Sequence, residues 1–321
     1  MTNAVAVVVC TYARSRVPLL RSAIASVRAQ RAEATELVIV VDGDSELERD
    51  LAGDLGGIVI ANCGPRGLSG ARNTGVAATR APLIAFLDDD AVAHDDWLRH
   101  LSEVFDDEQV MVAGGTVTPQ VAGPRPGWWP VEFDWVVGCS YPGQMIAGGG
   151  VQRVRNVIGA SMMIRRAALE AVGAFSTDLG RIGNLPVGGE ETELCIRVAA
   201  RFGPHAIVLE PRAEVYHHVP VERLTMHYLH ARCLAEGRSK AVLGRIVRSR
   251  AGLSSEARYL THTLPRAFLR HAGAALRGDL AGLARAGAIV SATAATVCGW
   301  LLGTVSARAL HADGGHGSSP S

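Results

Sequence analysis

The sequence lacks the marks of several specialised protein classes. Only 5% of its 321 residues are aromatic, and its six cysteines lie far apart without a C-x-x-C pair. Scattered cysteines exclude a zinc ribbon and a small disulfide-linked scaffold, and they favour reduced, buried thiols in a reducing compartment. The 36 glycines have no fixed period, which excludes a collagen-like or low-complexity chain.

An excess of charge of one sign is also missing. The chain has 32 Lys and Arg residues against 31 Asp and Glu residues, which gives a formal net charge of +1. This balance excludes a protein that coats nucleic acid through a basic surface, so we expect no nucleic-acid partner. The first residues show neither a basic segment nor a small-residue cleavage site, so no secretory signal is predicted and a cytoplasmic location is expected.

What the sequence does contain, over its first 115 residues, is an alternation of short apolar runs and helical patterns. The runs Val5–Cys10, Leu37–Val41 and Pro82–Leu87 are typical of buried strands. Helical stretches between such runs predict an α/β protein with a mixed, mainly parallel sheet and helices on both faces. Ligands of such sheets bind at the carboxyl ends of the strands, so the polar residues after each run are candidates for a site.

Three consecutive aspartates, Asp88, Asp89 and Asp90, follow the run Pro82–Leu87. Carboxylates two positions apart at a strand end can share one divalent cation with a substrate diphosphate, and the cation would relieve their mutual repulsion. The structural alternative makes Asp90 the N-cap of the following helix, with the other two aspartates solvated.

Two more segments place charged side chains at predicted helix starts. Arg72 lies in a glycine-rich segment, 62–73, that lacks the G-x-G-x-x-G spacing, so a dinucleotide-binding loop is disfavoured and Arg72 is a ligand contact or a surface cation. Glu190 and Glu191 follow two glycines at the start of an acidic helix. The helix dipole favours their ionised form, which suits a general base and equally suits helix capping.

Six segments occur in the order and with the spacing found in family 2 glycosyltransferases, which the chain resembles over residues 4–240. They are the segments 8–14, 41–45, 70–75, 86–90, 173–175 and 189–194. The resemblance implies a GT-A fold, which is Rossmann-like, and transfer of a sugar from a nucleoside diphosphate donor to an acceptor hydroxyl with inversion.

The resemblance also implies roles for individual residues. Asp90 would hold Mn²⁺ or Mg²⁺, with Asp88 and His217 as further ligands, while His218 would be structural. Glu191 would be the general base and Glu190 the second candidate. The implied donor-binding residues are Thr11, Tyr12, Arg14, Asp42, Arg72, Asp88 and Asp89.

Two departures from the family pattern affect these roles. The second strand ends in Asp-Gly-Asp where the family usually has Asp-Asp-Gly, so Asp42 aligns while Asp44 does not. Glu191 stands where the family commonly has an aspartate, and its carboxylate reaches one methylene further. A non-catalytic nucleotide-sugar-binding or membrane-docking subunit is therefore one alternative to an enzyme, and a polyprenyl-phosphate glycosyl transferase is an alternative within the class.

The middle of the chain is rich in proline and glycine and carries Trp128 and Trp129, which we expect to bind the acceptor. These indole rings could stack on sugar faces or form a hydrophobic lid. We expect residues 1–115 to form the nucleotide-sugar-binding half, and 116–220 the acceptor-binding and catalytic half, of one GT-A domain. The acceptor could be a glycan, a lipid-linked molecule or a small molecule.

A helical C-terminal extension is expected over 221–321, and the cytoplasmic membrane surface is a possible partner of this extension. Residues 221–285 hold twelve basic and four acidic side chains, and the stretch 286–307 has no charge. As a helix this stretch would be about 33 Å long, which suits a bilayer core, although its many small residues make insertion marginal. A membrane-spanning or re-entrant helix, a helix in the plane of the inner membrane face, and a soluble helix packed on the domain all stay open. Gly299-x-x-x-Gly303 would permit close helix contact.

Overall fold

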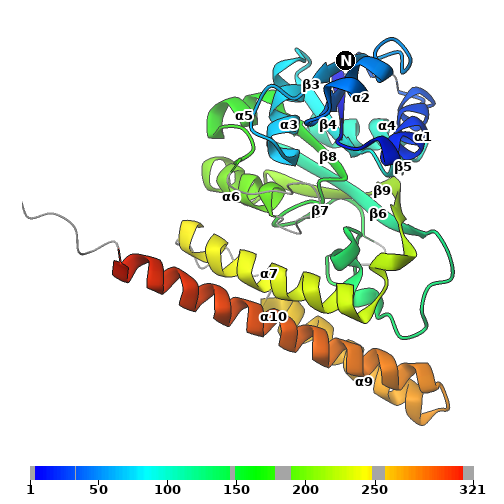
Figure 1. The fold of residues 1–321 in the computed structure, drawn as a ribbon, viewed down its shortest axis with the longest axis vertical. Coiled ribbons are helices and arrows are strands. Elements are labelled where there is room, and N and C mark those ends of the chain that lie inside the picture. The colour runs from blue at the N-terminus through cyan, green and yellow to red at the C-terminus, as the bar shows by residue number, and fades with distance from the viewer. Residues whose placement is uncertain (1–3, 33, 145–148, 178–188, 248–256, 314–321) are drawn as a thin grey trace, which may run out of the picture. The chain divides into compact units, whose positions relative to one another are not determined.

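A computed structural model describes residues 4–32, 34–144, 149–177, 189–247 and 257–313 (Figure 1). Its main feature is a nine-stranded sheet within these residues, in the order β3-β2-β1-β4-β8-β6-β9-β5, with β7 paired to β9. The strands are β1 (Val5–Thr11), β2 (Glu36–Val41), β3 (Ile58–Ala61), β4 (Leu83–Asp88), β5 (Ala91–Ala93), β6 (Val112–Val121), β7 (Gln152–Arg153), β8 (Ser161–Arg165) and β9 (Ile207–Val219).

One half of the sheet is parallel. Strands β1 to β4 run in the same direction, whereas β8 pairs antiparallel with both β4 and β6. Val8, Ile39 and Ile84 from the parallel half are at most 1% exposed, as expected for strands that helices cover on both faces. The mixed α/β sheet predicted from the apolar runs is confirmed.

Helices follow most of these strands. Helix α1 begins with a proline in its first turn and buries Leu20, Ile24 and Val27, the apolar positions at helical spacing. The helices are α1 (Val17–Arg28), α2 (Ser45–Leu51), α3 (Leu68–Ala77), α4 (Trp97–Glu103), α5 (Arg166–Val172) and α6 (Glu190–Phe202). Short 3₁₀ turns are η1 (Arg14–Arg16), η2 (Val104–Asp106), η3 (Val131–Val137) and η4 (Val221–Arg223).

Strand β9 is much longer than the apolar run 206–209 indicates. Its pairing with β6 shifts register between Gly115 and Thr116, so that residues after Glu210 bulge out and pairing resumes at Glu214. Gly115 makes the bulge possible, because a Cβ there would lie 2.0 Å from the carbonyl oxygen of Ala213. The strand thereby continues to His217, which is a predicted site residue.

The chain divides into two compact units, of which the second comprises residues 123–136 and the chain from residue 221 onward. Its helices are α7 (Met226–Val247), the π-helical turn η6 (Tyr259–Thr263), α9 (Leu264–Leu276) and α10 (Leu280–Asp313). The segment 123–136 is tied to these helices, because the Tyr259 hydroxyl donates to the Glu132 carbonyl at 2.6 Å and Arg270 contacts the Glu132 carboxylate.

Helices α7 and α10 lie side by side through small residues (Figure 1). A Cβ at Gly299 would lie 2.0 Å from the carbonyl oxygen of Leu234, and a Cβ at Gly237 would lie 2.1 Å from that of Thr296. Gly303 likewise lies against α7, at Arg238. The Gly299-x-x-x-Gly303 face therefore makes a close helix contact within the chain.

This contact predicts that Gly299→Ala lowers the free energy of unfolding by about 1–3 kcal/mol, because the added methyl group meets fixed backbone. Gly287→Ala is the matched control in the same helix, since a Cβ there meets nothing within 4 Å. It should leave stability unchanged or raise it by about 0.5 kcal/mol. Urea unfolding followed by circular dichroism measures both, and equal effects of the two substitutions would contradict the close contact.

Candidate active site

The carboxyl ends of β1, β2 and β4 bring predicted site residues together. Thr11 lies opposite Val41 next to Asp42, and Cys10 on the other side of β1 lies opposite Asp88. Asp42 is 8% exposed and accepts hydrogen bonds from Asn62 Nδ2 at 2.7 Å and from the Gly67 amide at 2.9 Å. Asp42 therefore anchors the glycine-rich loop that follows β3.

Tyr12 and Arg14 point toward the surface in this structure. Tyr12 is 38% exposed, and Arg14 pairs with Asp50 at 2.6 Å and with Glu46 at 3.5 Å on α2. Asp44 is the N-cap of α2, where its side chain accepts from the amides of the helix's first turn. This capping bond gives a structural reason for the Asp-Gly-Asp departure.

Arg16 is the site residue that the sequence reasoning missed. Its Nε lies 2.9 and 2.8 Å from the two carboxylate oxygens of Asp89, and its Nη2 lies 2.7 Å from Asp90 Oδ2. Asp89 is 3% exposed, and burial raises its pKa although Arg16 opposes the shift. The available signal was the second arginine in Arg-Ser-Arg, directly before a helix.

Asp88, Asp90 and His217 form a cluster that could hold a metal ion, with one ligand atom of each within 4.8 Å of the others. His217 Nε2 lies 3.2 Å from Asp90 Oδ1, and the His217 Nδ1 atom lies 3.7 Å from the Cys139 thiol. Burial opposes ionisation of Asp90, but the charges of His217 and Arg16 hold its pKa well below the usual range. Burial lowers the pKa of His217, but the Asp90 carboxylate outweighs it and raises that pKa to about 10.

Arg72 connects this cluster to α6. It is 2% exposed, and its guanidinium lies 5.8 and 5.4 Å from the ring centres of Phe86 and Phe175. It donates to Asp88 Oδ1 at 3.3 Å and to Glu190 Oε1 at 3.1 Å. Arg72 is therefore a buried cation shared by two carboxylates, and not a surface cation.

Glu190 and Glu191 form the first turn of α6, after Gly189, whose φ of +105° suits glycine. One oxygen of each carboxylate is buried and has no hydrogen-bond partner among the residues that the structure describes. Burial, followed by the charge of Glu190, raises the pKa of Glu191 to about 8, against the opposing charge of Arg72. A carboxylate with such a pKa is suited to accept a proton near neutral pH.

The tryptophans expected to bind the acceptor belong to the second unit. Trp129 is 2% exposed and donates from Nε1 to Asp134 Oδ1 at 2.8 Å. Trp128 is partly exposed and lies next to it, with 5.6 Å between ring centres. Only the Trp128 ring offers a partly open face in this arrangement.

Residues 6–173 match the family described as Glycosyl transferase family 2. The chain belongs to this family. A relative of this glycosyltransferase, the glucosyl-dolichyl phosphate glucuronosyltransferase of Haloferax volcanii, is 35% identical over 244 residues. The match covers 74% of this chain and 77% of the relative.

Solved structures share the fold of this glycosyltransferase. A mannosyltransferase from Pyrobaculum calidifontis, in complex with GDP-Man and Mn²⁺, aligns with 92% of this chain and 88% of its own, at 17% identity and a TM-score of 0.56. Glucosyl-3-phosphoglycerate synthase from Mycobacterium tuberculosis, in complex with Mn²⁺, UDP-glucose and phosphoglyceric acid, aligns with 77% of this chain and 80% of its own, at 16% identity and a TM-score of 0.50. The GT-A fold and the glycosyltransferase class expected from the six motifs are confirmed.

The His217–Asp90 pair predicts how stability of the glycosyltransferase depends on pH in the presence of a chelator. The pKa of His217 rises from 6.5 to about 10 on folding, so the native state binds more protons than the unfolded state between these values. Stability is therefore fully present below pH 6.5 and falls as the pH rises, by at most about 1.4 kcal/mol per pH unit for this group.

Thermal unfolding at about pH 7 and about pH 8, which is below the ordinary thiol pKa of about 8.5, measures the loss. Because Glu191 contributes to the same window, the informative quantity is the difference between the wild-type protein and His217→Gln. The wild-type protein should lose more stability than the variant over this interval. An equal loss in both proteins would show that Asp90 does not stabilise the protonated form of His217.

Proposed function

We propose that the protein is an inverting, metal-dependent transferase that moves a sugar from a nucleoside diphosphate donor to the hydroxyl of a lipid-linked acceptor. The observation that carries this proposal is the position of Arg72, which contacts Asp88 at the end of β4 and Glu190 at the start of α6. The Arg72 guanidinium thus contacts one of the aspartates expected to face the donor and one of the two glutamates considered as the base.

The donor set fits the implied metal ion. Asp88, Asp90 and His217 supply two carboxylates and one imidazole with ligand atoms within 4.8 Å of one another, which suits Mn²⁺ and, with water completing its shell, Mg²⁺. When bound, such a cation stabilises the negative charge that develops on the departing diphosphate.

In the proposed reaction Glu191 takes the proton of the acceptor hydroxyl. The hydroxyl oxygen then bonds to the anomeric carbon on the face opposite the diphosphate, and the electrons of the broken carbon–oxygen bond leave with the diphosphate. Arg72 pairs with Glu190 beside the base, and its positive charge favours the ionised form of Glu191. Glu190 is the second candidate for the base.

The acceptor class is proposed from the relative in Haloferax volcanii, whose name gives a glucosyl-dolichyl phosphate as the molecule that it modifies. A sugar on a polyprenyl phosphate offers the hydroxyl that Glu191 would deprotonate, and it would keep the acceptor at a membrane. We propose that the partly exposed ring of Trp128 contacts this acceptor. Buried Trp129 packs next to Trp128 and is held in place by its hydrogen bond to Asp134.

Glu191→Gln tests the proposed base. Transfer should fall by about 10²–10⁴-fold, because positioned proton transfer contributes that much to a rate. In the wild-type protein, kcat/KM should rise with pH and level off above the Glu191 pKa of about 8. Glu170→Gln, on the exposed face of α5, is the control and should keep wild-type activity.

The assay measures sugar transfer from a panel of nucleotide sugars to polyprenyl-phosphate-linked sugars with Mn²⁺. Wild-type rates in Glu191→Gln, or a rate that is flat across pH 6 to 9 in the wild-type protein, would remove Glu191 from the mechanism. If Glu190→Gln loses activity while Glu191→Gln keeps it, Glu190 is the general base instead of Glu191.

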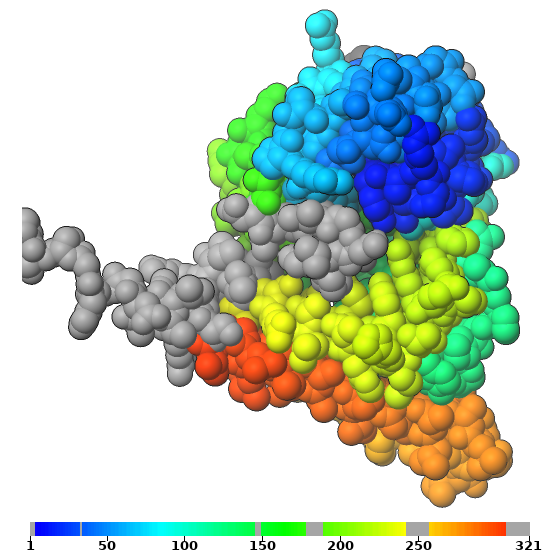
Figure 2. All heavy atoms as spheres, viewed as in Figure 1, coloured from blue at the N-terminus to red at the C-terminus, as the bar shows by residue number. Residues whose placement is uncertain are grey.

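We further propose that α10 contacts the inner face of the membrane. Its exposed apolar side chains recur at intervals of three, four or seven residues along one face of the helix. The helix, which is visible at the surface in Figure 2 (orange to red), is long and apolar enough to cross a bilayer. These side chains are Leu280, Leu283, Val290, Val297, Leu301 and Val305, and each is at least 47% exposed. A soluble helix would expose polar residues on this face.

The packing of α7 on the opposite face favours a helix that lies in the membrane plane. Gly237 and Gly299 bring the two helices into backbone contact, and α7 carries the Glu236–Lys240 ion pair next to this contact. If α10 crossed the bilayer, it would take these charges with it, at a cost of several kcal/mol. A helix pair in the plane buries the apolar face of α10 and leaves α7 in water.

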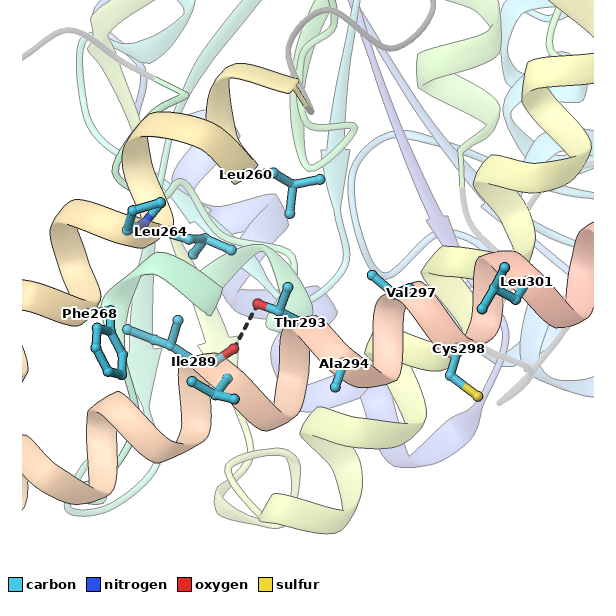
Figure 3. Close-up of a pocket in the computed structure, with 11 residues that line it drawn as sticks. Leu260, Leu264, Phe268, Ile289, Thr293, Ala294, Val297, Cys298 and Leu301 are labelled. Carbon is cyan, nitrogen blue, oxygen red and sulfur yellow. Dashed lines mark hydrogen bonds between the residues drawn. The ribbon is translucent and has the colours of Figure 1, made fainter.

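An apolar groove beside this face would take lipid chains. It has a volume of about 630 Å³ and lies between η6, α9 and α10. In Figure 3, Leu260, Leu264 and Phe268 lie on one side of it, and Val297 and Leu301 on the other. Exposed arginines on or beside these helices could pair with anionic headgroups, each contributing about 1 kcal/mol. They are Arg258, Arg266 and Arg277, whereas Arg270 and Arg285 already pair with Glu132 and Asp279.

Sedimentation with vesicles of neutral and anionic phospholipid tests this membrane face without donor or metal. The triple variant Val290→Ser, Val297→Ser, Leu301→Ser should bind at least about tenfold more weakly than the wild-type protein, since each side chain loses roughly 1 kcal/mol of burial. Ile58→Ser, which changes an exposed apolar residue of the first unit, is the control. Equal binding of the triple variant and the control would contradict the proposed face.

A further inference from the structure

The aspartates after β4 are already neutralised by side chains of the chain itself. Both oxygens of Asp89 face the Arg16 guanidinium. Asp90 has Arg16 Nη2 at 2.7 Å on Oδ2 and His217 Nε2 at 3.2 Å on Oδ1. Arg72 faces the third aspartate, Asp88, at 3.3 Å. Each carboxylate thus has a cationic partner, which is what lets this cluster be buried.

We propose that Arg16 competes with the divalent cation for Asp90, so that it lowers the affinity of the site for metal. A cation held by Asp88, Asp90 and His217 would share the Asp90 carboxylate with the Arg16 guanidinium. Two positive charges on one buried carboxylate repel each other strongly. Binding of the cation therefore requires that the contact between Arg16 and Asp90 breaks. The free-energy cost of breaking this contact weakens metal binding.

Arg16 differs from Arg72 in a way that suits this role. The Arg72 side chain is 3% exposed and enclosed by two aromatic rings, whereas the Arg16 side chain is 17% exposed. Arg16 ends the 3₁₀ turn η1, and its guanidinium lies 5.3 Å from the centre of the exposed Tyr12 ring. It can therefore turn toward solvent along the Tyr12 ring and keep its second partner, Asp89, while Arg72 has no comparable path.

This inference rests on the proposed metal dependence and extends it to how tightly the cation is held. Arg16 acts through Asp90 and is a positioning residue. Its charge lets the aspartate cluster fold without a cation, and it makes the bound cation exchangeable.

Calorimetric titration of the nucleotide-free protein with Mn²⁺ tests the proposal. Arg16→Gln should bind Mn²⁺ at least about tenfold more tightly than the wild-type protein, because a unit charge at a few ångströms from the ion is removed. Arg16→Lys keeps the positive charge and should stay within about threefold of the wild-type affinity, although it loses the paired contacts to Asp89. A purely structural role of Arg16 would weaken or leave unchanged the binding of Mn²⁺ in Arg16→Gln.

A second variant keeps the test decisive if Arg16→Gln does not fold. Arg16→Gln/Asp89→Asn removes both charges of the buried pair and leaves the proposed ligands intact. Because the lost Asp89 charge weakens cation binding, this variant is compared with Asp89→Asn, which keeps Arg16, and it should bind Mn²⁺ more tightly than Asp89→Asn does. Equal Mn²⁺ affinity in the wild-type protein and Arg16→Gln, or in Asp89→Asn and the double variant, would overturn the role of Arg16 while the metal site itself stands. Absence of Mn²⁺ binding in all of them would overturn both.

Discussion

Buried carboxylates are stable only when cations or hydrogen-bond donors face them, and this requirement determines how the first unit is built around the end of β4. The cations come from distant parts of the chain: Arg16 from the turn after β1, Arg72 from α3 and His217 from β9. Arg72 matters most, because it serves Asp88 and Glu190 together and is enclosed between Phe86 and Phe175. Gly159 leaves it room, since a Cβ there would lie 2.5 Å from the guanidinium. The aspartates after β4 and the glutamates at the start of α6 are therefore parts of one electrostatic unit.

The strand ends could be predicted from the sequence because parallel topology leaves them little freedom. Apolar runs separated by helices imply a sheet buried on both faces, and such a sheet places Thr11, Asp42 and Asp88 at one edge whatever the details of the loops. The motif order then identifies the family. His217 was harder to place, because it reaches the edge only through the bulge at Gly115, and no local pattern in the sequence marks that bulge.

The direction of individual side chains could not be predicted in the same way. Arg14 and Arg16 are two residues apart in one 3₁₀ turn, so one faces the carboxylates of α2 and the other faces Asp89. The sequence contains both arginines but not the turn that separates them. Trp129 is similar, because its burial depends on the Asp134 carboxylate that accepts from its indole nitrogen. The directions of these side chains depend on tertiary contacts, which a sequence pattern does not show.

In the second unit, the positions of small and large residues favour one of the arrangements of α10 that composition alone leaves open. An uncharged helix rich in Ala, Gly and Val is compatible with a membrane span, a helix on the membrane surface or a soluble core helix. In α10, Gly299 and Gly303 lie against α7, while the leucines and valines are exposed. A core helix would be buried on both faces, and a spanning helix would not be joined along one face to a charged partner. The two-sided distribution of small and large residues is thus what favours a helix lying along an apolar surface.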